Sequence, residues 1–244
     1  MTNIIKSNFI RNKRSPILWI SVLAPLLYVL AFAIYIAGPN SIRGEEIYSF
    51  FGGFVVLSSF ALSFFIPLCY EADREAGFYT NDLRFPISRK KIYLGKFLFI
   101  LILFALIVSI ASIGFLIALS IIGINSLGIK VNISLVALSF ITLLPLIPTY
   151  QFLTLKLGRS ISVLAGIFIT LAALLFGTTA LGEIIWPIIP FVWPIKIISL
   201  MAYSKIELSQ VMMFLIMAIL LTIVFLFFTS IWFKKWDVYM KTED

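Results

Sequence analysis

The chain has 244 residues, of which 61% are hydrophobic and 12% are charged, whereas soluble domains are about half apolar and about a quarter charged. This composition excludes an ordinary soluble protein and indicates an all-α protein that crosses a membrane several times. The formal net charge of +8 does not indicate nucleic-acid binding, because nearly all the excess Lys and Arg lies beside apolar runs. The single cysteine, Cys69, excludes an intrachain disulfide, and the absence of histidine removes most metal sites and most histidine-based catalysis.

The N-terminal segment up to Pro16 is basic and partly amphipathic, which predicts a helix lying in the membrane interface. The apolar side chains that can enter the interface are Ile4, Ile5, Phe9 and Ile10, and the basic ones that can face headgroups are Lys6, Arg11, Lys13 and Arg14. A cleaved signal peptide is the alternative, since Ala31-Phe32-Ala33 resembles a cleavage motif. The apolar run from Ile17 continues for about 20 residues, however, and that length suits an uncleaved transmembrane helix.

Six apolar windows free of Asp, Glu, Lys and Arg predict six transmembrane helices. They are Ile17–Ala37, Tyr48–Cys69, Phe97–Ile122, Leu135–Leu155, Ile161–Leu181 and Val211–Phe233. Proton-coupled carriers keep ionisable groups within the membrane because their chemistry needs them there. Their absence from these windows argues against a proton relay, so we expect any driving energy to come from outside the chain.

The basic residues are unevenly divided between the two sides that these six windows define. If the N-terminus is cytoplasmic, the inner segments hold 15 Lys and Arg residues and the outer segments hold 4. The four outer ones are Arg43, Lys130, Lys196 and Lys205. Since cytoplasmic loops carry the excess of Lys and Arg, we predict that both termini and the segment between the second and third windows are cytoplasmic.

The segment Glu71–Lys96, between the second and third windows, is the only long charged stretch of the chain. Glu71 and Arg74 are three residues apart and can pair on a short acidic helix that Gly77 would end, lying flat at the membrane surface. We expect this helix to dock on a soluble partner through Glu71, Asp73, Arg74, Glu75, Gly77, Phe78 and Tyr79. The alternative is a solvated loop whose basic residues only reflect the excess of Lys and Arg in cytoplasmic loops.

Two windows contain residues that affect helix geometry and packing. In the fourth, Pro145 and Pro148 are expected to kink the helix and to leave the carbonyls of Ile141 and Leu144 without helical partners, with lining of a transport pathway as the alternative. The fifth carries a stripe of small residues that permits another helix to approach closely. The stripe is Ser162, Gly166, Thr170, Ala173 and Gly177. Whether the neighbouring helix belongs to the same subunit or to a second one stays open.

The outer segment between the fifth and sixth windows, Gly182 to Gln210, is rich in tryptophan and proline rather than polar. Its marked residues are Trp186, Pro187, Pro190, Trp193 and Pro194. The prolines prevent a continuous helix, and the tryptophans are typical of a membrane interface. We predict two short helices that dip into the outer leaflet of the membrane. An interfacial anchor without a role in transport is the alternative.

Three motifs resemble those of a known family. The acidic run E-A-D-R-E-A-G from Glu71, the following P-I-S-R-x-x-x-x-x-G-K from Pro86, and W-P-I-I-P-F-V-W-P from Trp186 are similar to the permease subunits of type-2 ABC exporters. Within that group they most resemble the bacitracin and lantibiotic-immunity permeases. The resemblance extends in layout over residues 1–244 as a single transmembrane domain. It implies half of a translocation unit in a bacterial cell membrane, completed by a second, identical or homologous permease.

The resemblance also implies the partners and the cargo. ATP would be hydrolysed by separate ATPase subunits, and the chain lacks the G-x-x-x-x-G-K-[ST] loop that would bind ATP itself. No catalytic residue, cofactor or metal is expected on this chain. Besides membrane lipid, the implied cargo is a membrane-active peptide antibiotic. A non-transporting membrane scaffold or biogenesis factor, and a small channel or carrier without an ATPase, are the alternative functions.

Overall fold

The computed structural model describes residues 2–38, 44–75, 77, 87–124 and 129–236. Within these ranges every regular element is helical, as the composition predicts. The helices are α1 (Thr2–Arg11), η1 (Asn12–Arg14), α2 (Ile17–Ala37), α3 (Glu46–Glu75), α5 (Arg89–Ile122), α6 (Ile129–Leu143), α7 (Leu146–Leu157), α8 (Arg159–Thr178), η2 (Ala180–Gly182), η3 (Trp186–Ile188), α9 (Trp193–Ala202) and α10 (Leu208–Lys235).

Six spans in the described residues are long and apolar enough to cross a membrane, which confirms the predicted number. The first is α2, with the predicted bounds, and the fourth consists of α6 and α7 together. The helix α3 continues past the second apolar window into the charged residues up to Glu75. The helix α5 begins at Arg89, in the charged residues before the third window. The windows end where charges begin, whereas backbone hydrogen bonding continues, so charge alone does not end a helix.

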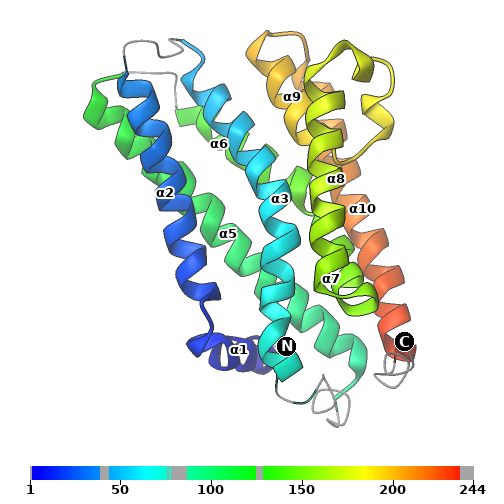
Figure 1. Cartoon of the computed structure of the whole chain (residues 1–244). Coiled ribbons are helices and arrows are strands. Elements are labelled where there is room, and N and C mark those ends of the chain that lie inside the picture. The colour runs from blue at the N-terminus through cyan, green and yellow to red at the C-terminus, as the bar shows by residue number, and fades with distance from the viewer. Residues whose placement is uncertain (1, 39–43, 76, 78–86, 125–128, 237–244) are drawn as a thin grey trace.

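The helices form one bundle in which α3 and α5 hold the other elements together (Figure 1). The helix α3 packs against α6, α7, α8 and α9, while α5 packs against α1, α2 and α10 and, more lightly, α6 and α7. The short helix α1 lies across the end of the bundle where α3 and α10 also end (Figure 1). We call this end the base of the bundle. The helix α9 lies towards the opposite end.

The fourth span is interrupted at its first proline. The helix α6 ends at Leu143 and α7 begins at Leu146, so Pro145 falls in the break and Pro148 in the first turn of α7. As predicted, the two prolines deprive the carbonyls of Ile141 and Leu144 of their i+4 partners, but neither carbonyl is left unbonded. The carbonyl of Ile141 accepts a hydrogen bond from the Leu144 N–H at 3.2 Å, and that of Leu144 accepts from the Ile147 N–H at 3.1 Å. Tightening to i→i+3 bonds therefore replaces the two bonds that proline removes.

The stripe of small residues on α8 is used inside this chain. All five stripe residues are buried, and they are the complete set of buried residues of α8. A side chain at Gly166 would overlap Ser63 of α3, and one at Gly177 would come within 3.0 Å of Ile195 in α9. The stripe thus lets α8 approach α3 and α9 closely, which answers the question of which subunit its neighbour belongs to.

One stripe residue also satisfies a backbone group. Pro67 lies inside α3 and lacks the N–H that would bond the carbonyl of Ser63. The hydroxyl of Ser162 donates to that carbonyl at 3.2 Å, across the interface between α3 and α8. Because the bilayer core offers no water to a freed carbonyl, this hydrogen bond makes the proline tolerable in the span.

The segment between α8 and α10 does not form a continuous helix, as its prolines predict, but it contains one short helix rather than the two expected. Two single 3₁₀ turns, η2 and η3, lead into α9, which begins with Trp193-Pro194. The Trp193 ring is 1% exposed, 5.3 Å from the ring of Phe214 in α10, and its indole N–H donates to the Pro187 carbonyl at 3.0 Å. Trp193 is therefore a packing and hydrogen-bonding residue of the protein interior rather than an exposed interface residue, whereas Trp186 is only partly buried.

Candidate functional site

The acidic residues that begin the charged stretch form the last turns of α3. The prediction of a separate short helix differs from this arrangement: Glu71 to Glu75 continue α3 without a break, because no glycine or proline follows Pro67 before Gly77. The predicted pair is confirmed, with Arg74 Nη2 2.5 Å from Glu71 Oε1. Gly77 has a φ of +115°, the left-handed region that favours glycine at a helix end. Phe78 and Tyr79 lie outside the described residues.

Asp73 differs from its acidic neighbours because it points into the protein. The residue is 6% exposed, whereas Arg74 and Glu75 are exposed. Its Oδ2 lies 2.5 Å from Lys96 Nζ of α5, and its Oδ1 lies 3.1 Å from Arg11 Nη1 of α1. Asp73 was expected to contact a soluble partner, and the structure instead assigns it to an ion pair between helices.

Lys96 is the centre of this arrangement. It lies about two turns inside α5 and is 3% exposed. Besides Asp73, its ammonium donates to Asn8 Oδ1 at 3.2 Å and sits 5.0 Å from the centre of the Tyr70 ring. The Tyr70 hydroxyl in turn accepts a hydrogen bond of 2.8 Å from Gln151 Nε2 of α7. We call these six residues the base network: Asn8, Arg11, Tyr70, Asp73, Lys96 and Gln151.

The base network is electrostatically demanding. A buried ammonium or carboxylate is stable only when its partner and further hydrogen bonds replace the lost water. Lys96 meets this requirement with Asp73 and Asn8, and Asp73 meets it with Lys96 and Arg11. Because the partners come from α1, α3 and α5, the pairing fixes the positions of these three helices relative to one another.

Apolar contacts seat α1 on α5 next to the ion pairs. A side chain at Gly95 would come within 2.5 Å of Ile4 Cγ2, so glycine here permits α1 to lie close to α5. The Phe9 ring meets the Phe99 ring edge-on at 4.9 Å. At the start of α5, Arg89 donates to the carbonyl of Trp236 at 2.6 Å, which ties the end of α10 to the same region.

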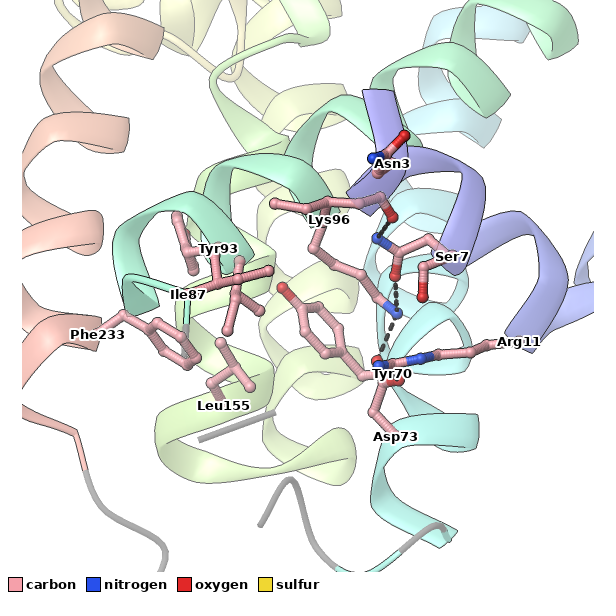
Figure 2. Close-up of a pocket in the computed structure, with 13 residues that line it drawn as sticks. Asn3, Ser7, Arg11, Tyr70, Asp73, Ile87, Tyr93, Lys96, Leu155 and Phe233 are labelled. Atoms are coloured by element: carbon pink, nitrogen blue, oxygen red, sulfur yellow. Dashed lines mark hydrogen bonds and ion pairs between the residues drawn. The ribbon is translucent and has the colours of Figure 1, made fainter. Parts of the chain in front are cut away.

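A cavity of about 240 Å³ lies within the base of the bundle (Figure 2). One wall carries polar side chains of α1 together with Asp73 and Lys96, and the other is mainly apolar and comes from the start of α5 and the ends of α7 and α10. The polar wall includes Asn3, Ser7, Asn8 and Arg11, and the opposite wall includes Ile87, Ile92, Tyr93, Leu155 and Phe233. In Figure 2, Asn3, Ser7 and Arg11 lie on one side of Lys96 and Tyr70. On the other side lie Ile87, Tyr93, Leu155 and Phe233.

A second, larger cavity lies between the spans. It has a volume of about 370 Å³ and is lined by α2, α3 and α5, with Tyr28 and Ser58 as its polar residues. Six aromatic rings line it: Tyr28, Phe54, Phe60, Phe64, Phe65 and Phe104. Leu57, Phe60 and Phe64 are exposed, so this groove opens at the outer surface of the spans.

The structure separates the predicted site residues into two places. The exposed Arg74 and Glu75 lie at the base of the bundle with the half-buried Glu71, while Trp186, Pro187, Pro190, Trp193 and Pro194 belong to the segment between α8 and α10. Sequence reasoning missed Lys96 and Asn8 as members of one site. The sequence signal for a buried Lys96 is its apolar context, between Gly95 and Phe97. Its partner could not be identified from the sequence, because Asp73 is 23 residues away in another helix.

The comparisons with known proteins agree with this architecture. The sequence model of a family described as ABC-2 family transporter protein matches residues 4–177, which run from the first turn of α1 to the last turn of α8 and contain the whole base network. No curated protein and no solved structure matches the chain. The matched residues make up more than half of the 244-residue chain, and the chain therefore belongs to the ABC-2 family of transporter proteins.

Proposed function

We propose that this chain is one permease of an ATP-driven exporter, with residues 1–244 forming a single transmembrane domain and a second permease supplying the other half of the pathway. ABC-2 permeases pair with ABC ATPases, and the exposed face of the last turns of α3 is the surface that we assign to the ATPase here. The face comprises the exposed Arg74 and Glu75 together with the half-buried Glu71. Phe78 and Tyr79 are proposed to extend it.

The observation that carries this proposal is the position of the base network directly behind that face. Asp73 belongs to the same helical turns as Glu71 and Glu75, yet binds Lys96 of α5 and Arg11 of α1. A displacement of the end of α3 by an ATPase would therefore move α1 and α5 with it. Tyr70 and Gln151 extend the connection to α7, which follows the break at Pro145. Such a connection supports a rigid-body exchange between two states of the bundle.

The proposed orientation places the base of the bundle in the cytoplasm, where ATP is available. It is supported by the 15 basic residues assigned to that side against 4 on the other. Both described ends of the chain, α1 and the end of α10, lie at the base (Figure 1). An even number of spans requires the two termini to share a side.

The cargo that we propose is a membrane-active peptide antibiotic, removed from the bilayer outward, with the chain in a bacterial cell membrane. The resemblance to bacitracin and lantibiotic-immunity permeases supports this class. The groove of about 370 Å³ between α2, α3 and α5 supports it as well, because its aromatic lining lacks ionisable side chains and suits an apolar molecule taken up from lipid.

The docking role is tested by reversing the charge of the exposed face. In the double variant Glu71→Lys with Glu75→Lys, like charges would face the basic partner surface that we infer, so the variant should insert normally, lose its ATPase on purification and export nothing. The matched control is Glu183→Lys, which makes the same change on an exposed residue outside the base. An inserted double variant that retains its ATPase and transports normally would falsify the docking role and favour a non-transporting scaffold or a carrier without an ATPase.

A further inference from the structure

The groove between α2, α3 and α5 contains a buried hydroxyl group with an unused proton. Ser58 of α3 lines the groove and is 8% exposed, and its hydroxyl has no hydrogen-bond partner among the described residues. We propose that the groove binds an uncharged aromatic group that carries a hydrogen-bond acceptor, with the acceptor at Ser58 and the rings among the aromatic side chains. The proposal rests on the proposed role of this groove in taking up cargo, and it names the chemistry that the groove selects.

Ser58 differs from the other buried hydroxyls of the spans. Serine and threonine inside helices can donate to the carbonyl one turn earlier in their own helix. Ser21, Thr142 and Thr222 do so here, each at 2.7 Å. The hydroxyl of Ser58 makes no such bond, and the bilayer core offers no water that could replace it. A ligand with an acceptor would therefore complete the bonding of this group.

The second polar residue of the groove has already used its proton. The hydroxyl of Tyr28 donates to the carbonyl of Phe50 in α3 at 2.6 Å. Among the described residues that line the groove, none is Asp, Glu, Lys or Arg. A charged ligand would thus enter an apolar space without a counter-charge, which is costly. The groove favours an uncharged ligand, and Ser58 is the donor that remains for it.

The aromatic lining of the groove favours a ligand that contains rings. Phe54, Phe65 and Phe104 are buried and form its inner part, while Phe60 and Phe64 are exposed at its opening. Aromatic rings attract one another in edge-on and offset arrangements, beyond what burial of apolar area provides. The volume of about 370 Å³ lies within the range of sites for small molecules. One or two rings of a ligand therefore suit this space.

The depth of Ser58 distinguishes such a ligand from a lipid chain. The residue lies in the middle of the apolar part of α3, Tyr48–Cys69, about 15 Å along the helix from either end. Because the hydrocarbon core is about 30 Å thick, a phospholipid presents only its hydrocarbon chain at this depth. A lipid chain could fill the groove but would leave the Ser58 hydroxyl unbonded. The position favours a molecule that brings an acceptor to the middle of the membrane.

Two pairs of variants separate the hydrogen bond from the space. Ser58→Ala removes the donor, and Ser58→Thr keeps a hydroxyl. Ser59→Ala is the matched control, because Ser59 is the adjacent buried serine, its hydroxyl also lacks a partner, and it does not line the groove. Ala24→Phe places a ring in the groove. Ala31→Phe adds the same ring at an exposed position of the same helix, outside the groove.

The probe is benzophenone, which has two rings and one ketone oxygen and attaches to nearby C–H bonds on irradiation. It is added to the purified full chain in lipid nanodiscs without an ATPase, and peptide mass spectrometry locates the labelled residues. We expect labelling of residues that line the groove. Ser58→Ala should raise the concentration for half-maximal labelling about fivefold, which corresponds to about 1 kcal/mol. Ala24→Phe should abolish the labelling, while Ser58→Thr, Ser59→Ala and Ala31→Phe should keep it.

Diphenylmethane is the matched ligand, because it has the same two rings without the oxygen. It should displace a trace of benzophenone at the same concentration from the unaltered chain and from Ser58→Ala, since neither protein can donate a hydrogen bond to it. Thermal unfolding of each purified variant verifies that it is folded.

Three results would overturn the proposal. Labelling spread evenly over the outer surfaces of the spans would mean that the groove holds no ligand. Equal half-maximal concentrations for the unaltered chain and Ser58→Ala would exclude the hydrogen bond. Equal weakening by Ser58→Ala and Ser59→Ala, or an equal effect of Ser58→Ala on both ligands, would assign the change to the packing of α3.

The outcome can be told apart from the outcome for the exporter. A chain that retains its ATPase and exports, but shows no labelling of the groove, would overturn the groove site alone. Specific labelling of a chain that retains no ATPase would support the groove site and overturn the proposed function.

Discussion

At the scale of single residues, Lys96 is the position on which the base of the bundle depends. A lysine buried two turns inside a long apolar helix is stable only because Asp73 and Asn8 lie within hydrogen-bonding distance. The exposed lysines at the start of the same helix, Lys90 and Lys91, have water instead. The same side chain therefore has different energetic roles at positions five or six residues apart.

Replacing Lys96 by methionine should destabilise the protein by about 3 kcal/mol, because it leaves the buried Asp73 carboxylate with Arg11 as its remaining cation. Methionine keeps most of the side-chain volume, so the loss reflects charge rather than a cavity. The measurement is the temperature at which the detergent-purified protein loses its monodisperse elution peak. Lys90→Met, at an exposed position, should leave that temperature unchanged, and equal shifts for both variants would contradict the assignment.

The residues of the base network show the limit of prediction from this sequence. The Glu71–Arg74 pair could be predicted because it depends only on helical spacing. The Asp73–Lys96 pair could not, since the two residues lie in different helices and meet only when α3 and α5 pack together. Charge counting assigned both to a water-exposed segment, whereas burial depends on tertiary contacts that a hydropathy window does not contain.

The hydroxyl of Ser162 offers a second test at this scale. Ser162→Ala should cost about 1 kcal/mol of stability, because the Ser63 carbonyl freed by Pro67 then lacks its donor inside the membrane. Ser109→Ala is the control: Ser109 is exposed, and its hydroxyl bonds only the carbonyl one turn earlier in its own helix. Unfolding of both variants in lipid nanodiscs should separate them. A neutral Ser162→Ala would mean that the carbonyl finds another donor.

At the scale of elements, the pairing of α8 with α3 is the contact that small residues decide. Spacing predicted the stripe from Ser162 to Gly177 correctly, but could not identify its neighbour, since a stripe of small residues fits any closely approaching helix. The structure pairs it with α3 and α9 of the same chain. The second permease proposed above is therefore expected to contact other surfaces of the chain.

Gly166→Ala should lower the stability of the single chain by about 1–3 kcal/mol, because the new methyl group overlaps Ser63. Adding Ser63→Gly removes the obstructing side chain and should recover part of the loss. Chemical unfolding of the single and double variants in mixed micelles measures both effects. If Gly166→Ala weakens only the association between chains, and not the folded chain, the in-chain assignment is wrong.

At the scale of the whole molecule, the arrangement of six spans with α1 and the end of α10 at one end could be predicted from hydropathy and helix length. The break between α6 and α7 was predicted from its prolines, although as a kink in one helix rather than as two helices joined by a tightened turn. The sequence does not show which hydrogen bonds replace those that proline removes, and in a membrane the freed backbone groups must find partners within the protein.

The orientation of the molecule makes a direct prediction about labelling. In a Cys69→Ser background, an impermeant thiol reagent added to intact cells should react with Tyr203→Cys, at a 60% exposed position beyond α9. It should not react with Lys90→Cys until the membrane is opened. Reaction of Lys90→Cys in intact cells would reverse the proposed sidedness and would remove the ATPase from the base of the bundle.

The length of α5 has a consequence for the response of this protein to its membrane. Its apolar part, Phe97–Ile122, corresponds to about 39 Å, against about 30 Å for the hydrocarbon thickness of a bilayer, and Figure 1 shows the helix running obliquely through the bundle. The 20 residues of α8 correspond to about 30 Å and match that thickness almost without tilt. A thinner bilayer would favour a flatter α5, a thicker one a steeper α5, while α8 has no such adjustment. Hydrophobic mismatch would thus act on the angle between α5 and α8, and lipid chain length would become a variable that regulates the shape of the bundle.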